Sequence, residues 1–300
     1  MTEFIQHIIN GLSVGGVYAL VALGYTMVFG ILQLINFAHG DVFMLGAFAG
    51  YFFIRAFGLA DTPSFANLTL TILVAMVACA AVGFLIERLA YRPLRKAPRI
   101  NLLITAVGVS LFLEISGQLG FGSDPKFFPQ VFVPTGEWDF AGVMLNPLQL
   151  IVFSISIVLM ALLQFVIFKT RLGRAMRAVS FNHDLASLMG IPTNLVISLT
   201  FMLGSALAGA AGVLVGLTYP NIDPLMGVMF GLKAFVAAVL GGIGNVVGAV
   251  VGALFLGLAE EFVVAYLAPT FRDALAFMLL ILVLLVKPTG LFGVARKEKV

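Results

Sequence analysis

The chain has 300 residues, of which 61% are hydrophobic and 10% are charged, with a net charge of +3 and a mean hydropathy of +1.11. Soluble domains carry about 25% charged residues, so this composition excludes an ordinary soluble protein. The long unbroken apolar runs exclude a transmembrane barrel, whose strands alternate over roughly ten residues. We therefore predict an all-α, polytopic membrane bundle that forms a single domain over residues 1–300.

The apolar runs indicate where the chain crosses the membrane. A spanning helix needs about 20 mostly apolar residues. The runs lie, in chain order, at residues 5–29, 42–57, 65–86, 100–121, 148–168, 195–217, 225–240, 246–264 and 274–286. The last run is short and must extend through Arg272 and Asp273 to cross. We expect about eight or nine transmembrane helices, with short broken or re-entrant helices among them.

The placement of cations predicts the orientation. Three segments hold 13 of the 17 Lys and Arg residues: Arg88, Arg92, Arg95, Lys96 and Arg99; Lys169, Arg171, Arg174 and Arg177; and Lys287, Arg296, Lys297 and Lys299. Cytoplasmic loops are enriched in Lys and Arg, so all three segments and the C-terminus are expected in the cytoplasm. The loop 122–146, which carries Asp124, Glu137 and Asp139, then faces outward, and the N-terminus lies outside.

Polar residues interrupt the apolar pattern between the first two runs. Asn36, His39 and Asp41 fall in the stretch 33–41, and Gly40 suggests that a helix begins beside Asp41. Irregular backbone in a membrane is tolerated where it lines protein or water. The stretch is therefore either an element of a translocation path or gate, or an ordinary capped turn at the cytoplasmic surface.

Single charges inside predicted spans are candidates for the path by default. Glu114 and Lys233 are such residues, although Lys233 is also compatible with a side chain that snorkels to water. We expect Glu260 and Glu261 to be solvated at an outer helix end. Glu87 and Arg88 are expected to mark the inner interface.

The segment from Lys169 to Pro192 is a polar island, longer than a membrane connector needs. A partner in the cytoplasm would explain its length. The sequence has no P-loop motif, no H-E-x-x-H motif and no Cys/His cluster. We therefore predict no enzyme activity, no cofactor and no metal site, and the energy for any transport must come from elsewhere.

Four stretches, spread over nearly the whole chain, resemble one family. They are INFAHGD at 35–41, GRAMR at 173–177 with ASLMGI at 186–191, GGIGNVVGAVVGA at 241–253, and KPTGLFG at 287–293. The chain resembles the inner-membrane permease subunits of bacterial branched-chain amino acid ABC transporters. Relatives of this kind also carry other amino acids, amides or urea, so the motifs specify the family better than the substrate.

The resemblance implies a complex embedded in membrane lipid, with no nucleic-acid partner. It would contain a second permease, two cytoplasmic ATP-binding subunits and a periplasmic solute-binding protein. It also implies that residues 173–191 are the coupling segment that docks on an ATPase, with contacts from Arg174, Arg177, Asn182, Asp184, Leu185, Leu188 and Gly190.

The residues of this segment fit such a role. Met176, Val179, Leu185 and Leu188 would cover one face of a short amphipathic helix, and Gly190 suits a left-handed C-terminal cap. Where many importer permeases have Glu-Ala-Ala, this chain has Arg177-Ala-Val-Ser, which leaves open which of these side chains make the contacts.

Two other functions compete with an ABC importer permease. A secondary amino acid transporter would work without an ATPase, and would need intramembrane carboxylates such as Asp41 and Glu114 for ion coupling. A structural membrane protein without a path has only the glycine-rich helix faces in its favour, for example Gly204, Ala208, Gly212 and Gly216.

Overall fold

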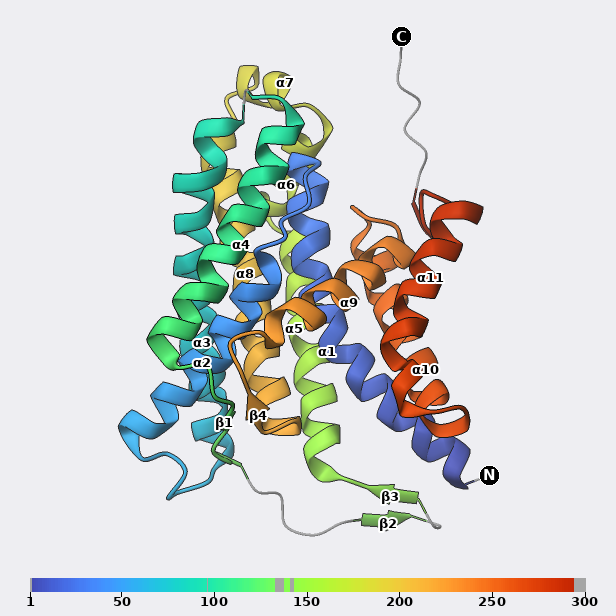
Figure 1. Cartoon of the computed structure of the whole chain (residues 1–300). Helices are drawn as coiled ribbons and strands as arrows, with labels where there is room; N and C mark the ends of the chain where they lie inside the picture. Colours follow the sequence, from blue (N-terminus) through green and yellow to red (C-terminus); the bar gives the residue numbers. More distant parts are fainter. Residues whose placement is uncertain (1, 96, 133–137, 141–142, 294–300) are drawn as a thin grey trace.

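The computed structural model describes residues 2–95, 97–132, 138–140 and 143–293. The chain is almost entirely helical (Figure 1). The α-helices are α1 (Thr2–Leu32), α2 (His39–Phe57), α3 (Phe65–Ile86), α4 (Arg99–Phe121), α5 (Pro147–Lys169), α6 (Arg171–Phe181), α7 (His183–Leu188), α8 (Thr193–Thr218), α9 (Met226–Gly241), α10 (Val246–Tyr266) and α11 (Arg272–Val286).

Short elements connect these helices. A π-helical turn η1 (Glu87–Tyr91) and a 3₁₀ turn η2 (Arg92–Leu94) follow α3, and η3 (Pro269–Phe271) precedes α11. Four strands pair as two antiparallel ribbons: β1 (Lys126–Phe127) with β4 (Asn221–Ile222), and β2 (Trp138–Phe140) with β3 (Val143–Leu145). The predicted all-α membrane bundle is confirmed.

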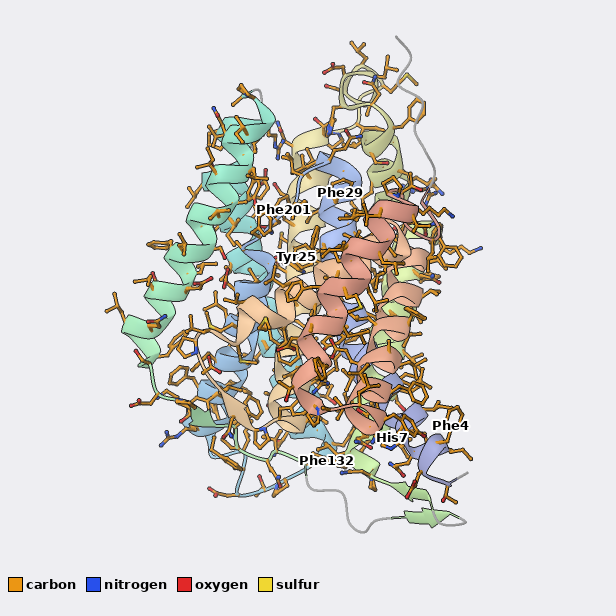
Figure 2. All side chains as sticks on the ribbon, turned by 45° about the vertical axis from the view of Figure 1, so that its right-hand side comes forward. Phe4, His7, Tyr25, Phe29, Phe132 and Phe201 are labelled. Atoms are coloured by element: carbon orange, nitrogen blue, oxygen red, sulfur yellow. The ribbon has the colours of Figure 1, made fainter. Side chains whose placement is uncertain are left out.

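The core of the bundle is built on α1 and α8. Most residues of both helices are buried, whereas few residues of α4, α5 and α11 are. The helix α10 packs along α1, and α2 and α3 pack along α8. Figure 2 shows Tyr25 and Phe201 within the bundle, while Phe4 and His7 lie at one end of it.

Small residues allow these close helix contacts. A Cβ added at Gly204 of α8 would lie 3.2 Å from the Cα of Gly24 in α1. Close approach of backbones through small residues is how helices associate in lipid, where no hydrophobic effect drives them together.

The three cation-rich segments lie at one end of the bundle, which we call the cationic end. It contains α6, α7, the turns between α3 and α4, and the last turn of α11 (Figure 1). The N-terminus and the strands lie at the opposite end, which we call the strand end. Lys96, Arg296, Lys297 and Lys299, also predicted on the cationic side, lie outside the described residues.

Eight helices are long and apolar enough to cross a membrane, and α9 is a shorter apolar helix of the same kind. The chain starts at the strand end, and α11 finishes at the cationic end (Figure 1). Ends on opposite sides require an odd number of crossings. Counting α9 with the eight gives nine spans among the described residues, an odd number that agrees with these two ends.

Candidate functional site

The polar stretch before α2 is buried inside the bundle. Asn36, His39 and Asp41 are each only 1–2% exposed. The Tyr91 hydroxyl donates to the Asn36 side-chain oxygen at 2.9 Å, and the His39 ring packs edge-on against Tyr25 at a centroid distance of 4.8 Å. An ordinary solvent-facing turn does not describe this stretch, because the chain re-enters the bundle before α2 begins.

Two of the predicted path residues come together through α4. The Ser110 hydroxyl donates to Asp41 at 2.5 Å and lies 3.4 Å from the Glu114 carboxylate. Ser110 precedes Glu114 by one helical turn, so α4 presents both side chains toward α2. Sequence spacing gave no sign of Ser110, because the contact joins residues 69 positions apart.

The first turns of α2 and α9 meet where α2 begins. A Cβ added at Gly40 would fall on the backbone of Gly227 and would lie 3.0 Å from the Cα of Gly231. Tyr25 lies beside the same contact. Glycine at these positions lets two helix ends touch next to His39 and Asp41.

Lys233 belongs to a separate ionic network between α9, α10 and α11. Its ammonium lies 3.1 Å from Glu260 and 2.7 Å from Asp273, and the Arg272 guanidinium donates to Glu260 at 2.9 Å. The Tyr18 hydroxyl also donates to Glu260 at 3.0 Å. Lys233 is 6% exposed, so it is paired inside the bundle and does not snorkel.

Two acids expected at interfaces are buried instead. Glu260 and Glu87 are both 0% exposed. Glu87 pairs with Arg95 and accepts a hydrogen bond from Ser198 of α8 at 2.5 Å. The prediction that Glu260 is solvated was therefore wrong, because the sequence gave no indication of its distant partners. Glu87 does lie at a helix end beside exposed Arg88, but it is covered by protein.

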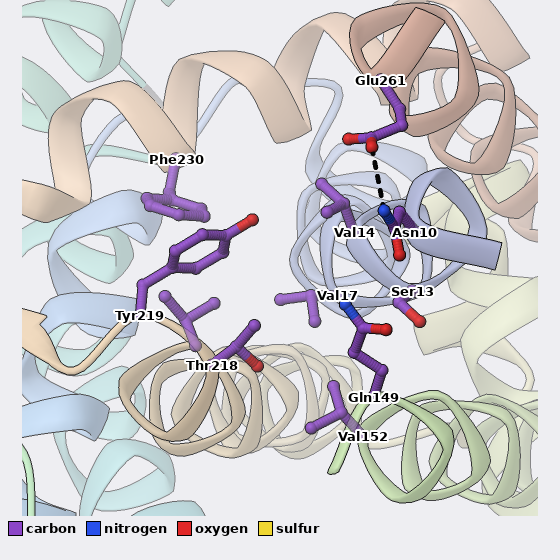
Figure 3. Close-up of a pocket in the computed structure, with 11 residues that line it drawn as sticks. Asn10, Ser13, Val14, Val17, Gln149, Val152, Thr218, Tyr219, Phe230 and Glu261 are labelled. Atoms are coloured by element: carbon purple, nitrogen blue, oxygen red, sulfur yellow. Dashed lines mark hydrogen bonds between the residues drawn. The ribbon is translucent and has the colours of Figure 1, made fainter. Parts of the chain in front are cut away.

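A cavity of about 120 Å³ lies in the half of the bundle nearer the strand end (Figure 3). We call it the outer cavity. Its walls come from α1, α5, α8, α9 and α10. The residues that line it are Asn10, Ser13, Val14, Val17, Gln149, Val152, Val215, Thr218, Tyr219, Phe230 and Glu261. Asn10 donates to Glu261 at 3.1 Å, and His7 lies 3.2 Å from the same carboxylate.

A larger cavity of about 710 Å³ opens toward the cationic end, and we call it the inner cavity. It lies between the last turns of α1 and α5, the helix α6, and the loop between α9 and α10. Thr26, Arg177, Thr200 and Asn245 contribute polar groups to it. None of the five predicted path residues, Asn36, His39, Asp41, Glu114 and Lys233, lines either of these two cavities.

The predicted coupling segment is a pair of helices rather than one. Thr170 caps α6 by accepting from the Gly173 N–H at 3.1 Å. Asn182 caps α7 by accepting from the N–H groups of Asp184 and Leu185 at 2.9 and 3.0 Å. Gly190 has φ of +80°, so the predicted left-handed cap is confirmed.

The apolar residues of the two helices point in different directions. Met176 and Val179 of α6 are buried against the bundle, whereas Leu185 and Leu188 of α7 are 54% and 82% exposed. The prediction that these four share one face was wrong, because α6 ends at Phe181 and Asn182 starts a new helix. The tip also exposes Phe181 and Met189.

Two hydrogen bonds tie this segment to the bundle. The His183 ring bonds to the carbonyl oxygen of Ile31, in the last turn of α1, at 3.0 Å. Arg177 donates to the carbonyl of Ile167 near the end of α5 and lies over the Phe168 ring at 5.6 Å. Arg174 and Asp184 are exposed.

Comparison with known proteins identifies the family. A family model described as the permease component of branched-chain amino acid transport systems matches residues 7–284. The chain belongs to this family. It is therefore a multi-pass membrane transport subunit, as its motifs predicted.

Permease relatives match over nearly all of this chain. The chain is 42% identical to the high-affinity branched-chain amino acid transport permease protein BraD of Pseudomonas aeruginosa, over 99% of this chain and 98% of the relative. It is 43% identical, with the same coverage, to the corresponding protein LivH of Escherichia coli. A permease named LivM, from Salmonella typhimurium, is 24% identical over 94% of this chain and 69% of its own length.

Proposed function

We propose that this chain is the permease of an ATP-driven importer of branched-chain amino acids in the bacterial inner membrane, with the cationic end in the cytoplasm. Its full-length similarity to permeases named for these substrates is the observation that carries the proposal. Those relatives are components of transport systems, which favours an importer subunit over a secondary transporter that works alone. Two permeases, two ATP-binding subunits and a periplasmic binding protein would make up the complete importer.

The exposed tip of α7 supports docking on an ATP-binding subunit. Leu188 and Asp184 are one helical turn apart and face away from Ala186, which packs against the bundle at 4% exposure. Leu188 and Met189 are each 82% exposed. A cluster of large apolar side chains at a water-exposed tip is typical of a protein interaction site.

The contacts of α6 and α7 give a route for coupling. Docking forces on α7 would reach the end of α1 through the bond from His183 to Ile31, directly before the stretch that carries Asn36, His39 and Asp41. Arg177 links the same segment to α5. We propose that ATPase closure moves these helix ends and alternates access to a path for the amino acid, with Glu114 and Lys233 as further path candidates.

A charge at the docking face tests the coupling role. Leu188→Glu would bury a carboxylate against the ATPase, and charges taken out of water without a partner are costly. We expect ATP-driven leucine uptake in proteoliposomes to fall at least tenfold, with the permease still present in the membrane. We also expect that the ATPase subunits no longer copurify with the Leu188→Glu permease.

Ser187→Glu is the matched control, because it adds the same charge to α7 at a neighbouring position that lies about 100° around the helix from Leu188. It should retain most of the uptake. Normal uptake and normal copurification with Leu188→Glu would show that α7 does not dock on the ATPase.

A further inference from the structure

We infer that the outer cavity is a binding site for an amino-acid zwitterion with a branched aliphatic side chain, held inside this one subunit. This inference rests on the proposed substrate class. It assigns a site to residues from five helices, of which only Glu261 is charged.

The size and walls of the cavity fit such a ligand. A single water needs roughly 10–15 Å³ of such space, and this cavity has about 120 Å³. Four valines and Phe230 supply the apolar wall: Val14, Val17, Val152 and Val215. Ligand sites are mostly apolar pockets with a few placed polar groups, and this composition suits a short branched side chain.

The polar groups of the cavity fit the ligand's ammonium. The Glu261 carboxylate lies at the cavity wall with its side chain 16% exposed. The side-chain oxygen of Gln149 is buried without a hydrogen-bond partner among the described residues. The Glu261 carboxylate would pair with the ligand's ammonium beside Asn10, and Gln149 adds a second polar group on another part of the wall (Figure 3).

The arrangement around the opening supports entry from the strand end. Figure 3 shows Tyr219 and Phe230 on one side of the cavity, with Asn10, Gln149 and Glu261 across from them. Tyr219 is 42% exposed, so it lies at the mouth. Its hydroxyl points toward the cavity and would donate to the ligand's carboxylate.

The outer and inner cavities lie along the same three helices. Both are lined by α1, α5 and α8, toward opposite ends of the bundle. Between them the bundle is closed along α1, where the side chains of Leu20 and Leu23 are 0% exposed. A site on one side of a closed contact, with a larger opening on the other, is what alternating access requires.

Protection of a single thiol tests occupancy directly. Cys79 is the one cysteine of the chain and is 1% exposed, so Ser13→Cys introduces a second thiol of this chain, at the wall of the cavity. In the purified membrane complex we expect L-leucine to slow labelling of this thiol by a small methanethiosulfonate reagent. At ten times the dissociation constant the free site, and with it the rate, falls about tenfold.

Two controls separate binding from indirect effects. Ser123→Cys, exposed near the strand end but outside the cavity, should label at the same rate with and without leucine. With Glu261→Gln added to Ser13→Cys, the leucine concentration needed for half of the full protection should rise about ten- to hundredfold. Glu3→Gln, which replaces an exposed acid at the start of α1, should leave that leucine concentration unchanged.

Ligand analogues test the assigned contacts. Leucinamide, which keeps the ammonium, should protect, whereas 4-methylpentanoate, which lacks it, should not. Equal protection by 4-methylpentanoate would overturn the role of Glu261.

A parallel uptake assay distinguishes the two proposals. A complex that takes up leucine with ATP, but whose Ser13→Cys thiol is not protected by leucine, would overturn this site and leave the importer intact. A complex that takes up no branched-chain amino acid would overturn the proposed function itself.

Discussion

At the scale of single residues, the ionic network around Glu260 is neutral as a group. Lys233 and Arg272 balance Glu260 and Asp273, and Glu260 also accepts from Tyr18. A buried pair contributes little net stability when complete, but removal of one partner leaves a charge uncompensated. The network therefore fixes α9, α10 and α11 to α1 in one arrangement.

Neutralising Glu260 should destabilise the protein. In Glu260→Gln, the Lys233 and Arg272 cations lose their shared buried partner, at a cost of about 3–5 kcal/mol. We expect a lower denaturation temperature in detergent, read from the loss of the monodisperse peak on heating. Glu3→Gln, which removes an exposed acid, should denature like the wild type. Equal temperatures for all three proteins would show that the network does not hold these helices.

A second residue-scale prediction concerns the contact of α2 with α9. Gly40→Ala would push its methyl group into the backbone of Gly227, and overpacking of this kind costs about 1–3 kcal/mol. Gly108→Ala, in a helix where nothing lies within 4 Å of the added carbon, is the matched control. Heating in detergent should separate the two variants. A Gly40→Ala protein as stable as Gly108→Ala would mean that α2 and α9 do not meet closely in the membrane.

At the scale of elements, the sequence predicted the positions of interruptions better than their surroundings. The polar stretch at 33–41, the gap between the apolar runs that end at 240 and resume at 246, and the helix stop at Gly190 all lie where the sequence predicted them. Each depends on local chemistry, such as a cap or a left-handed glycine. The directions in which the side chains of α6 and α7 point do not depend on local chemistry alone. The chain bends at Asn182, and as a result Val179 is buried while Leu188 is exposed.

The cavities also could not be predicted from the sequence. The outer cavity takes wall residues from five helices between Asn10 and Glu261, and no spacing rule joins them. Intramembrane charges pointed to Lys233 as a path residue, because an isolated charge in a span is a functional candidate. Its partners Glu260 and Asp273 lie on other helices, and only the tertiary structure brings them within 4 Å of it.

At the scale of the whole molecule, the number of crossings depends on α9. Its 16 residues extend only about 24 Å, less than the roughly 30 Å hydrocarbon core. The residues before it lengthen the crossing, since β4 pairs with β1 at the strand end and Ile222 is fully buried. Irregular backbone at membrane depth is tolerated where protein surrounds it, as it does here.

Nine crossings predict that the two ends of the chain lie on opposite sides of the membrane. Because Cys79 is buried, Thr2→Cys and Leu291→Cys each provide a single accessible thiol. In spheroplasts, a membrane-impermeant maleimide should label Thr2→Cys directly, and Leu291→Cys only after the membrane is permeabilised. Ser123→Cys, near the strand end, should behave like Thr2→Cys. Labelling of both chain ends from the same side would instead give eight crossings, with α9 entering and leaving at one surface.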